Sequence, residues 1–146
     1  MSSECRRRGR QTRSASWQAT VQRAELYVRT HLDAPIPLSE LCREVGLSER
    51  GLRNAFYGVH GMSPKRWILT ERLLQSQTAL RKPGNVTLTV TSVAADHGFY
   101  QLGRFAGMYR QRFGETASET LRAACRTGRR STTTDREGDG DASTHR

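Results

Sequence analysis

The strongest constraint on how this chain can fold is a pattern that occurs twice. In each copy a small residue lies four positions before a glycine, Cys42 before Gly46 and Ala94 before Gly98. A small side chain lets two helices approach closely, and glycine can adopt the left-handed conformation that a tight turn between helices requires. Each copy therefore predicts two short helices joined by a sharp turn.

The segment after each turn repeats the same spacing of apolar residues. The intervals are four and then five residues in both copies, Leu52 to Phe56 to Gly61 and Phe105 to Tyr109 to Gly114. The turn itself is one residue longer in the second copy. A repeat with this agreement is much rarer by chance than a single amphipathic helix, so it predicts two copies of one helix-turn-helix unit.

The other apolar patterns predict helices over most of the chain. Five of the expected helices are Trp17–His31, Pro37–Val45, Ser48–Gly61, Pro64–Arg81 and Ser118–Ala124. A sixth helix is capped by Thr89 or Thr91 and ends at His97, and a seventh contains Phe105. The residues assigned to buried faces include Trp17, Val21, Ala24, Leu26, Tyr27, Val28 and Leu32, then Leu52, Ala55, Phe56 and Val59. Residues 87–91 also alternate like a strand, but one strand has no partner here. We therefore predict an all-α fold of about seven helices.

These elements predict two helix-turn-helix subdomains joined by a long central helix. The first unit is expected over residues 17–63, the linker helix over 64–81 and the second unit over 82–125. The linker helix would span about 27 Å at about 1.5 Å per residue. Residues 1–16 and 126–146 contain little that could pack, so we predict a disordered basic arm and a disordered tail.

The net charge of the chain is +10, which implies an anionic partner. Fourteen basic and nine acidic residues lie between positions 17 and 125, so the excess persists without the ends. There is no apolar run of some 18 residues and no apolar signal-peptide core, so we expect a soluble, cytoplasmic protein that avoids membranes. Three widely separated cysteines fit reduced thiols, with Cys42 as a packing residue.

The helix after the first turn has a polar face opposite its apolar one. Arg50, Arg53, Asn54 and Tyr57 cluster nearly half a turn away from Leu52 on a wheel of about 100° per residue. This face suits a DNA major groove, where arginine pairs with guanine and asparagine with adenine. A lone polar stripe is also typical of a solvated surface, but the repeat favours DNA.

The corresponding face of the second copy is nearly smooth. Gly103, Ala106, Gly107 and Arg110 lie opposite Phe105. Two glycines inside a helix cost about 1 kcal/mol each relative to alanine. They are explained either by a close approach of the helix backbone to DNA or by a weakened motif.

The chain resembles the DNA-binding domain of AraC-type transcription regulators from about Trp17 to Arg122. The matching residues are Gly46-Leu47-Ser48, Leu52, Phe56, Gly61-Met62-Ser63-Pro64-Lys65, Trp67, Arg72-Leu73, Ala94, Gly98-Phe99, Phe105, Tyr109 and Phe113-Gly114. The resemblance implies two recognition helices in successive major-groove segments, often with DNA bending. The family usually adds a ligand-binding or dimerisation domain, for which this chain has no room. Ala117 stands where the family commonly has proline.

Two sets of residues are expected to contact DNA. The base-reading set is Arg50, Arg53, Asn54, Tyr57, Leu102, Arg104, Ala106 and Arg110, with Leu102 and Ala106 meeting thymine methyl groups. The phosphate set is Ser48, Lys65, Arg66, Arg81, Lys82 and Arg112. No metal or cofactor is expected.

An enzyme is disfavoured by the absence of a reactive motif. The four histidines never stand at metal-ligand spacing with cysteine or carboxylate, and no phosphate loop or nucleophile elbow occurs. We expect a transcription activator that binds double-stranded DNA and RNA polymerase in the nucleoid. The alternative is a protein-interaction module, or a truncated half of a regulator, that modulates a longer relative or RNA polymerase with little specific DNA binding.

Overall fold

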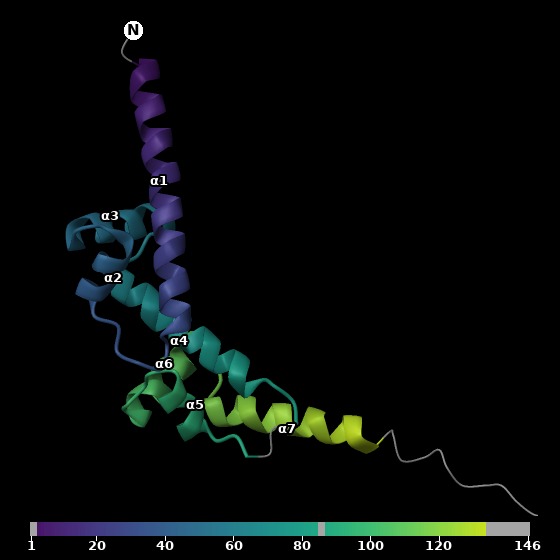
Figure 1. Cartoon of the computed structure of the whole chain (residues 1–146). Helices are drawn as coiled ribbons and strands as arrows, with labels where there is room; N and C mark the ends of the chain where they lie inside the picture. Colours follow the sequence, from purple (N-terminus) through teal and green to yellow (C-terminus); the bar gives the residue numbers. More distant parts are fainter. Residues whose placement is uncertain (1–2, 85–86, 134–146) are drawn as a thin grey trace, which may run out of the picture. The chain divides into compact units, whose positions relative to one another are not determined.

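The computed structural model describes residues 3–84 and 87–133, which form seven α-helices and no strand (Figure 1). The helices are α1 (Ser3–Thr30), α2 (Leu38–Val45), α3 (Glu49–His60), α4 (Pro64–Leu80), α5 (Val90–Asp96), α6 (Leu102–Phe113) and α7 (Ala117–Thr133). The all-α prediction is confirmed. Residues 87–89 lead into α5 rather than forming a strand, and Thr89 Oγ1 accepts a hydrogen bond from the Ser92 amide at 3.0 Å.

The chain divides into two compact units. The first contains Met1–Leu74 and Asp96–Gly98, and the second contains Gln75–Ala95 and Phe99–Arg146. The division falls inside α4, and the turn after α5 belongs to the first unit.

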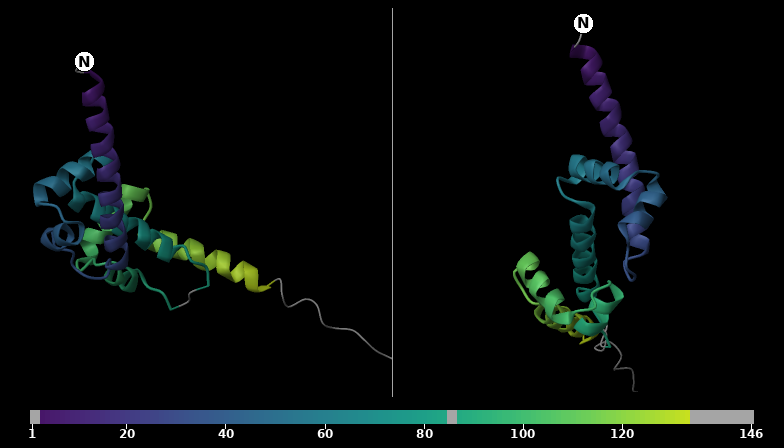
Figure 2. Two further views of the ribbon diagram at one scale, coloured as in Figure 1. Left: turned by 45° about the horizontal axis from the view of Figure 1, so that its top comes forward. Right: turned by 90° about the vertical axis from the view of Figure 1, so that its left-hand side faces the viewer.

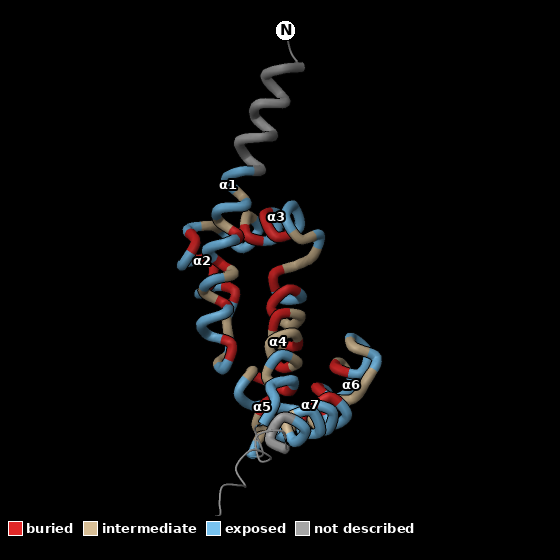
Figure 3. Tube along the Cα trace, turned by 90° about the vertical axis from the view of Figure 1, so that its right-hand side faces the viewer, coloured by how far each residue is buried: buried red, intermediate tan, exposed pale blue. Residues whose placement is uncertain are grey.

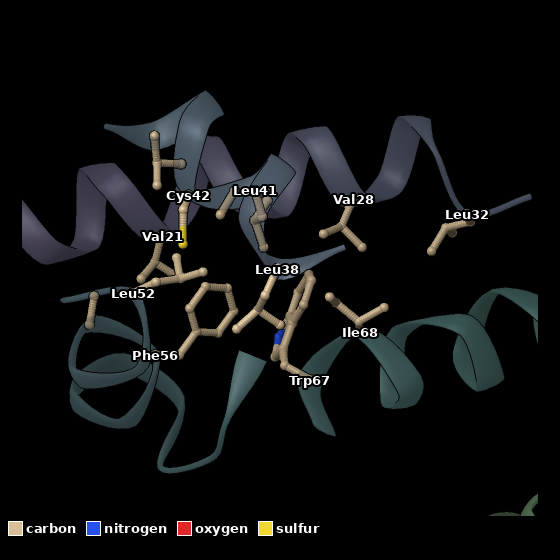
Figure 4. Close-up of a cluster of buried hydrophobic side chains, with 13 residues drawn as sticks. Val21, Val28, Leu32, Leu38, Leu41, Cys42, Leu52, Phe56, Trp67 and Ile68 are labelled. Atoms are coloured by element: carbon tan, nitrogen blue, oxygen red, sulfur yellow. The ribbon is translucent and has the colours of Figure 1, made fainter. Parts of the chain in front are cut away.

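The core of the first unit is built from one face each of α1, α2 and α3 and from the start of α4. Leu52 and Phe56 are fully buried, and the Phe56 ring meets Trp67 edge-on with 5.8 Å between ring centroids (Figure 4). The cluster contains Val21, Ala24, Val28, Leu32, Leu38, Leu41, Cys42, Val45, Leu52, Ala55, Phe56, Trp67 and Ile68. Trp17 and Tyr27 pack against it, as predicted, and α2 and α3 lie beside the part of α1 that carries these residues (Figure 2).

Helix α1 is longer than the sequence predicted. It begins at Ser3, so the prediction of disorder is wrong for residues 3–16. Likewise α7 continues to Thr133, beyond the predicted end of the second unit, whereas residues 1–2 and 134–146 lie outside the described residues. The composition of residues 3–16 indicates only that few of their side chains can pack. A helix can still extend through them, because each added residue gains a hydrogen bond without the cost of a new nucleus.

Two apolar residues that we assigned to buried faces are exposed. Leu26 is 66% exposed and Val59 is 36% exposed. Leu26 lies about 140° from Val21 on a wheel of 100° per residue, outside the arc that faces the core. Val59 is in the last turn of α3, beyond Phe56, where the buried cluster ends.

The second unit packs α7 against α6. Phe105 and Tyr109 of α6 are fully buried, and the Tyr109 hydroxyl donates a hydrogen bond of 2.9 Å to Thr120 Oγ1 of α7. Thr120 in turn donates to Glu115 at 2.7 Å. Desolvation by burial raises the pKa of Tyr109. The back of α6 is therefore fixed by both apolar contact and a satisfied polar pair.

A capping box starts α7 in place of the expected proline. The Thr116 amide donates to Glu119 Oε2 at 2.8 Å, and the Glu119 amide donates to Thr116 Oγ1 at 3.2 Å. This reciprocal pair satisfies two backbone donors that a helix start would leave open. The chain thus begins α7 at Ala117 without proline.

Both turn glycines have the left-handed conformation that we predicted, with φ of 72° at Gly46 and 78° at Gly98. Their surroundings differ. A methyl group added at Gly46 would meet nothing within 4 Å, whereas one at Gly98 would lie 2.5 Å from Nη1 of Arg72 and 2.8 Å from the Leu32 carbonyl oxygen. Arg72 donates hydrogen bonds to the Gly98 carbonyl at 3.1 Å and to the Ala34 carbonyl at 2.7 Å.

Candidate nucleic-acid interface

The first candidate surface is the exposed side of α3, which the core holds in place from behind. The buried residues of α3 are Leu52, Ala55 and Phe56, and Figure 3 colours the buried positions of this helix and of its neighbours. Ser48 caps the helix by accepting a hydrogen bond of 3.1 Å from the Gly51 amide. At the other end His60 Nε2 lies 2.6 Å from a carboxylate oxygen of Glu25 in α1. The helix therefore presents a fixed front to solvent.

All four base-reading candidates of α3 are exposed on this front. Tyr57 is 57% exposed. Arg53 Nη2 lies 3.3 Å from Glu49 Oε2, and both side chains are 55% exposed. An exposed pair at this spacing contributes about 0.3–0.5 kcal/mol, so Arg53 can leave Glu49 for a stronger acceptor. The structure thus groups Arg50, Arg53, Asn54 and Tyr57 on one surface.

The second candidate surface is the exposed side of α6, and it carries far fewer side chains. Arg104, Ala106 and Arg110 are exposed, and Leu102 is 44% exposed. A methyl group added at Gly103 or Gly107 would meet nothing within 4 Å. Packing inside the protein therefore does not require glycine at either position.

The start of α6 differs from that of α3. Gln101 occupies the cap position with extended backbone, and its side chain makes no capping hydrogen bond. The first amides of a helix have no acceptor within the helix, so those of α6 lack the side-chain partner that Ser48 gives to α3.

The phosphate candidates lie at helix ends and on exposed faces. Lys65 and Arg66 are exposed in the first turn of α4, where Ser63 Oγ accepts from the Arg66 amide at 3.3 Å. Ser48, the cap of α3, is exposed as well. These three residues belong to the first unit, and the exposed side chains of Arg81, Lys82 and Arg112 belong to the second.

One exposed residue was missed by the sequence analysis. Tyr100 stands before α6 and is 69% exposed. In the repeat it follows Phe99 as Ser48 follows Leu47, but the longer second turn moves the cap position on to Gln101. The extra residue in the second turn was the signal that this segment would differ.

Residues 3–84 and 87–133 contain no group of three or more histidine, cysteine, aspartate or glutamate side chains that could hold a metal ion. In the same ranges no helix combines the length and the apolar character needed to cross a bilayer.

Two helix-turn-helix motifs, each with a buried back and an exposed front on its second helix, define a helix-turn-helix DNA-binding domain. The helix-turn-helix domain family matches residues 41–123. The crystal structure of a probable AraC family transcriptional regulator from Rhodopseudomonas palustris is 37% identical, with a TM-score of 0.66 over 73% of this chain and 97% of that one. The chain belongs to the AraC family of transcription regulators, which confirms the resemblance seen in the sequence.

Other relatives agree with this assignment. The XylDLEGF operon transcriptional activator of Pseudomonas putida is 36% identical over 101 residues, 69% of this chain and 32% of its own length. The chain thus spans about a third of that relative. The DNA-binding domain of AdpA, solved with a target DNA, shares the fold at 24% identity, with a TM-score of 0.60 over 68% of this chain and 87% of that one. Because these relatives are regulators, the family confirms that the chain is not an enzyme.

Proposed function

We propose that this chain is a sequence-specific DNA-binding transcription regulator that inserts α3 and α6 into successive major-groove segments. The observation that carries the proposal is the front of α3, where two arginines, an asparagine and a tyrosine are exposed on a helix whose back is fully buried. The related domain of AdpA was solved in complex with a target DNA, which supports the same kind of partner here.

The two recognition helices would divide the work of recognition. Arg50, Arg53, Asn54 and Tyr57 would supply most of the base contacts, because their side chains offer donors and acceptors matching guanine and adenine edges. Arg104 and Arg110 would add contacts from α6. Leu102 and Ala106 would meet thymine methyl groups, since apolar side chains recognise that group in the major groove.

Contacts to phosphate would fix the position of the protein without reading sequence. Lys65 and Arg66 suit this role, because both are exposed in the first turn of α4, where the helix dipole adds positive potential. Ser48, Arg81, Lys82 and Arg112 complete the set.

The names of the relatives support a proposal for the biological setting. Several relatives are named as transcriptional activators, so we propose activation through RNA polymerase at the chromosome, in the cytoplasm. The residues proposed to contact bases and phosphates all lie in the DNA-binding domain.

The test begins with selection of bound sites from a random DNA pool at near-physiological salt, which is expected to return a motif with two half-sites. Arg50→Ala should then weaken binding to the selected site by about 1–3 kcal/mol and relax specificity at one position, while Lys65→Ala should weaken all sequences alike. Recovery of no motif would reject sequence-specific regulation and favour a protein-interaction module. Equal losses on selected and random DNA for both variants would reject the division between base and phosphate contacts.

A further inference from the structure

Helix α7 carries a row of arginines that the proposed function does not use. Arg122, Arg126 and Arg129 follow one another at intervals of four and three residues, and all three are exposed. On a wheel of about 100° per residue they fall within about 60° of one another, with Arg130 beside them. We call Arg122, Arg126, Arg129 and Arg130 the α7 arginine face.

The opposite side of α7 is packed, so this face is held outwards. Ala117, Thr120 and Ala124 are buried at 4%, 3% and 9% exposure. Farther along, a methyl group added at Gly128 would lie 2.8 Å from the Gly84 amide nitrogen, which shows how closely the helix approaches the segment after α4. The packing therefore reaches as far along the helix as the arginines do.

The arginines of α7 outnumber its acids between residues 117 and 130. Glu119 is the single acid between residues 117 and 130, and its carboxylate caps the helix start by accepting from the Thr116 amide. In the described ranges no ion pair involves Arg122 or Arg126. Attraction to the helix C-terminus would favour Arg130, but that effect is confined to the last turn. It does not account for Arg122.

The spacing and charge of the face fit a polyanion backbone. From Arg122 to Arg129 the helix rises about 10 Å at about 1.5 Å per residue, which matches three base-pair steps of about 3.4 Å. Protein interfaces are anchored by tryptophan and tyrosine as well as arginine, and this face offers no aromatic side chain. Repeated guanidinium groups instead match a repeating phosphate.

We propose that the α7 arginine face binds the sugar-phosphate backbone of the same DNA that the recognition helices read. This inference rests on the proposed function, because it assigns a further contact surface to the same complex. The contacts would be independent of base sequence. They would add about three phosphate contacts to the electrostatic part of the binding free energy.

The experiment compares the full chain with a variant in which Arg122, Arg126 and Arg129 are all changed to Gln. Dissociation constants are measured on the selected site and on random DNA between 50 and 300 mM salt, conditions chosen to span about a sixfold range. Glutamine is a good helix former on an exposed face, so circular dichroism and thermal unfolding should match the wild type. Neutralising three phosphate contacts should reduce the slope of log K against log salt by about 2.7 and weaken binding on the order of 10- to 100-fold at 150 mM.

Two controls separate charge at this face from net charge. The matching triple Lys variant should keep most of the slope, since lysine also neutralises phosphate. Arg126→Gln should lower the slope by about 0.9, whereas Arg43→Gln, which removes an exposed arginine of α2 outside both predicted contact sets, should leave it unchanged.

The outcomes are distinct. If the triple Gln variant binds both DNAs with the wild-type slope, the inference is wrong while the proposed function stands. If DNA binding is unchanged but transcription from a reporter falls, the face serves an acidic protein and the DNA assignment is overturned. If the wild type itself binds no DNA, the proposed function fails first.

Discussion

Helices α3 and α6 occupy the same place in the two repeats. Their buried sides are alike, whereas their exposed sides differ. Both bury an aromatic residue in the middle of the back, Phe56 in α3 and Tyr109 in α6, each at 0% exposure. Their fronts differ, because α3 shows two arginines, an asparagine and a tyrosine where α6 shows two glycines, an alanine and an arginine. Packing within the protein therefore constrains which residues stand on the back of such a helix. The residues on its front are constrained only by a binding partner.

The turns before the two helices provide the largest test of this comparison. Gly46→Ala should cost about 1–2 kcal/mol from left-handed strain alone. Gly98→Ala should cost about 3–5 kcal/mol, because the same strain is joined by overlap with Arg72 and the Leu32 carbonyl oxygen. Urea unfolding of both variants measures the difference. Equal losses would show that Arg72 moves aside, so that the two turns are equivalent.

The helix starts test a smaller difference. Ser48→Ala should destabilise the fold by about 1 kcal/mol, because the Gly51 amide loses its acceptor. Gln101→Ser should act in the opposite direction by a similar amount, since Gln101 makes no capping bond in the present structure. Thermal unfolding of the two variants checks the signs. A loss of stability in Gln101→Ser would mean that the start of α6 is capped in another way.

Substitutions of Gly103 and Gly107 on the exposed side of α6 test whether DNA binding requires glycine there. Gly103→Ala and Gly107→Ala should each stabilise the fold by about 0.5–1 kcal/mol, because the added methyl groups meet open space in the protein. We expect both to weaken DNA binding, since a methyl group would hold the helix backbone away from the duplex.

Gly58→Ala in α3 is the matched control for these variants. Its methyl group would lie 2.8 Å from the Trp17 ring, so this change should destabilise the protein. If Gly103→Ala and Gly107→Ala gain stability and bind DNA as tightly as the wild type, the second motif is weakened rather than closely docked.

The smallest expected effect concerns the helix that follows α6. The backbone hydrogen bond from Thr116 holds the pKa of Glu119 below its ordinary value. A carboxylate whose pKa is lowered by folding stabilises the protein above its unfolded pKa, near 4.3, and loses that contribution as pH falls through the folded pKa. Glu119→Ala should therefore be less stable than the wild type at pH 7, with the gap closing in acid. A gap that is constant from pH 7 to pH 3 would contradict this cap.

Much of the fold followed from local patterns. The repeat, the turn glycines and the apolar spacing predicted the ends of α2 and α3 and the existence of all seven helices, because helix periodicity and end signals act between near neighbours. Local patterns failed for Leu26, whose apolar character did not reveal that it faces solvent, and for residues 3–16, where an established helix continues. The candidate site was predicted on α3 as a group, whereas Tyr100 and the α7 arginine face were not found.

The sequence by itself determined the two-motif architecture and the polar front of α3, because both depend on spacings within one helix or one turn. Only the tertiary structure decided which glycines the fold requires. Gly46, Gly98, Gly103 and Gly107 look alike in the sequence, yet Gly98 alone among them lies against a side chain and a carbonyl group from distant segments. Steric contact is a property of neighbours in space, so residues far apart in the chain decide whether a glycine is required by packing or left open for DNA.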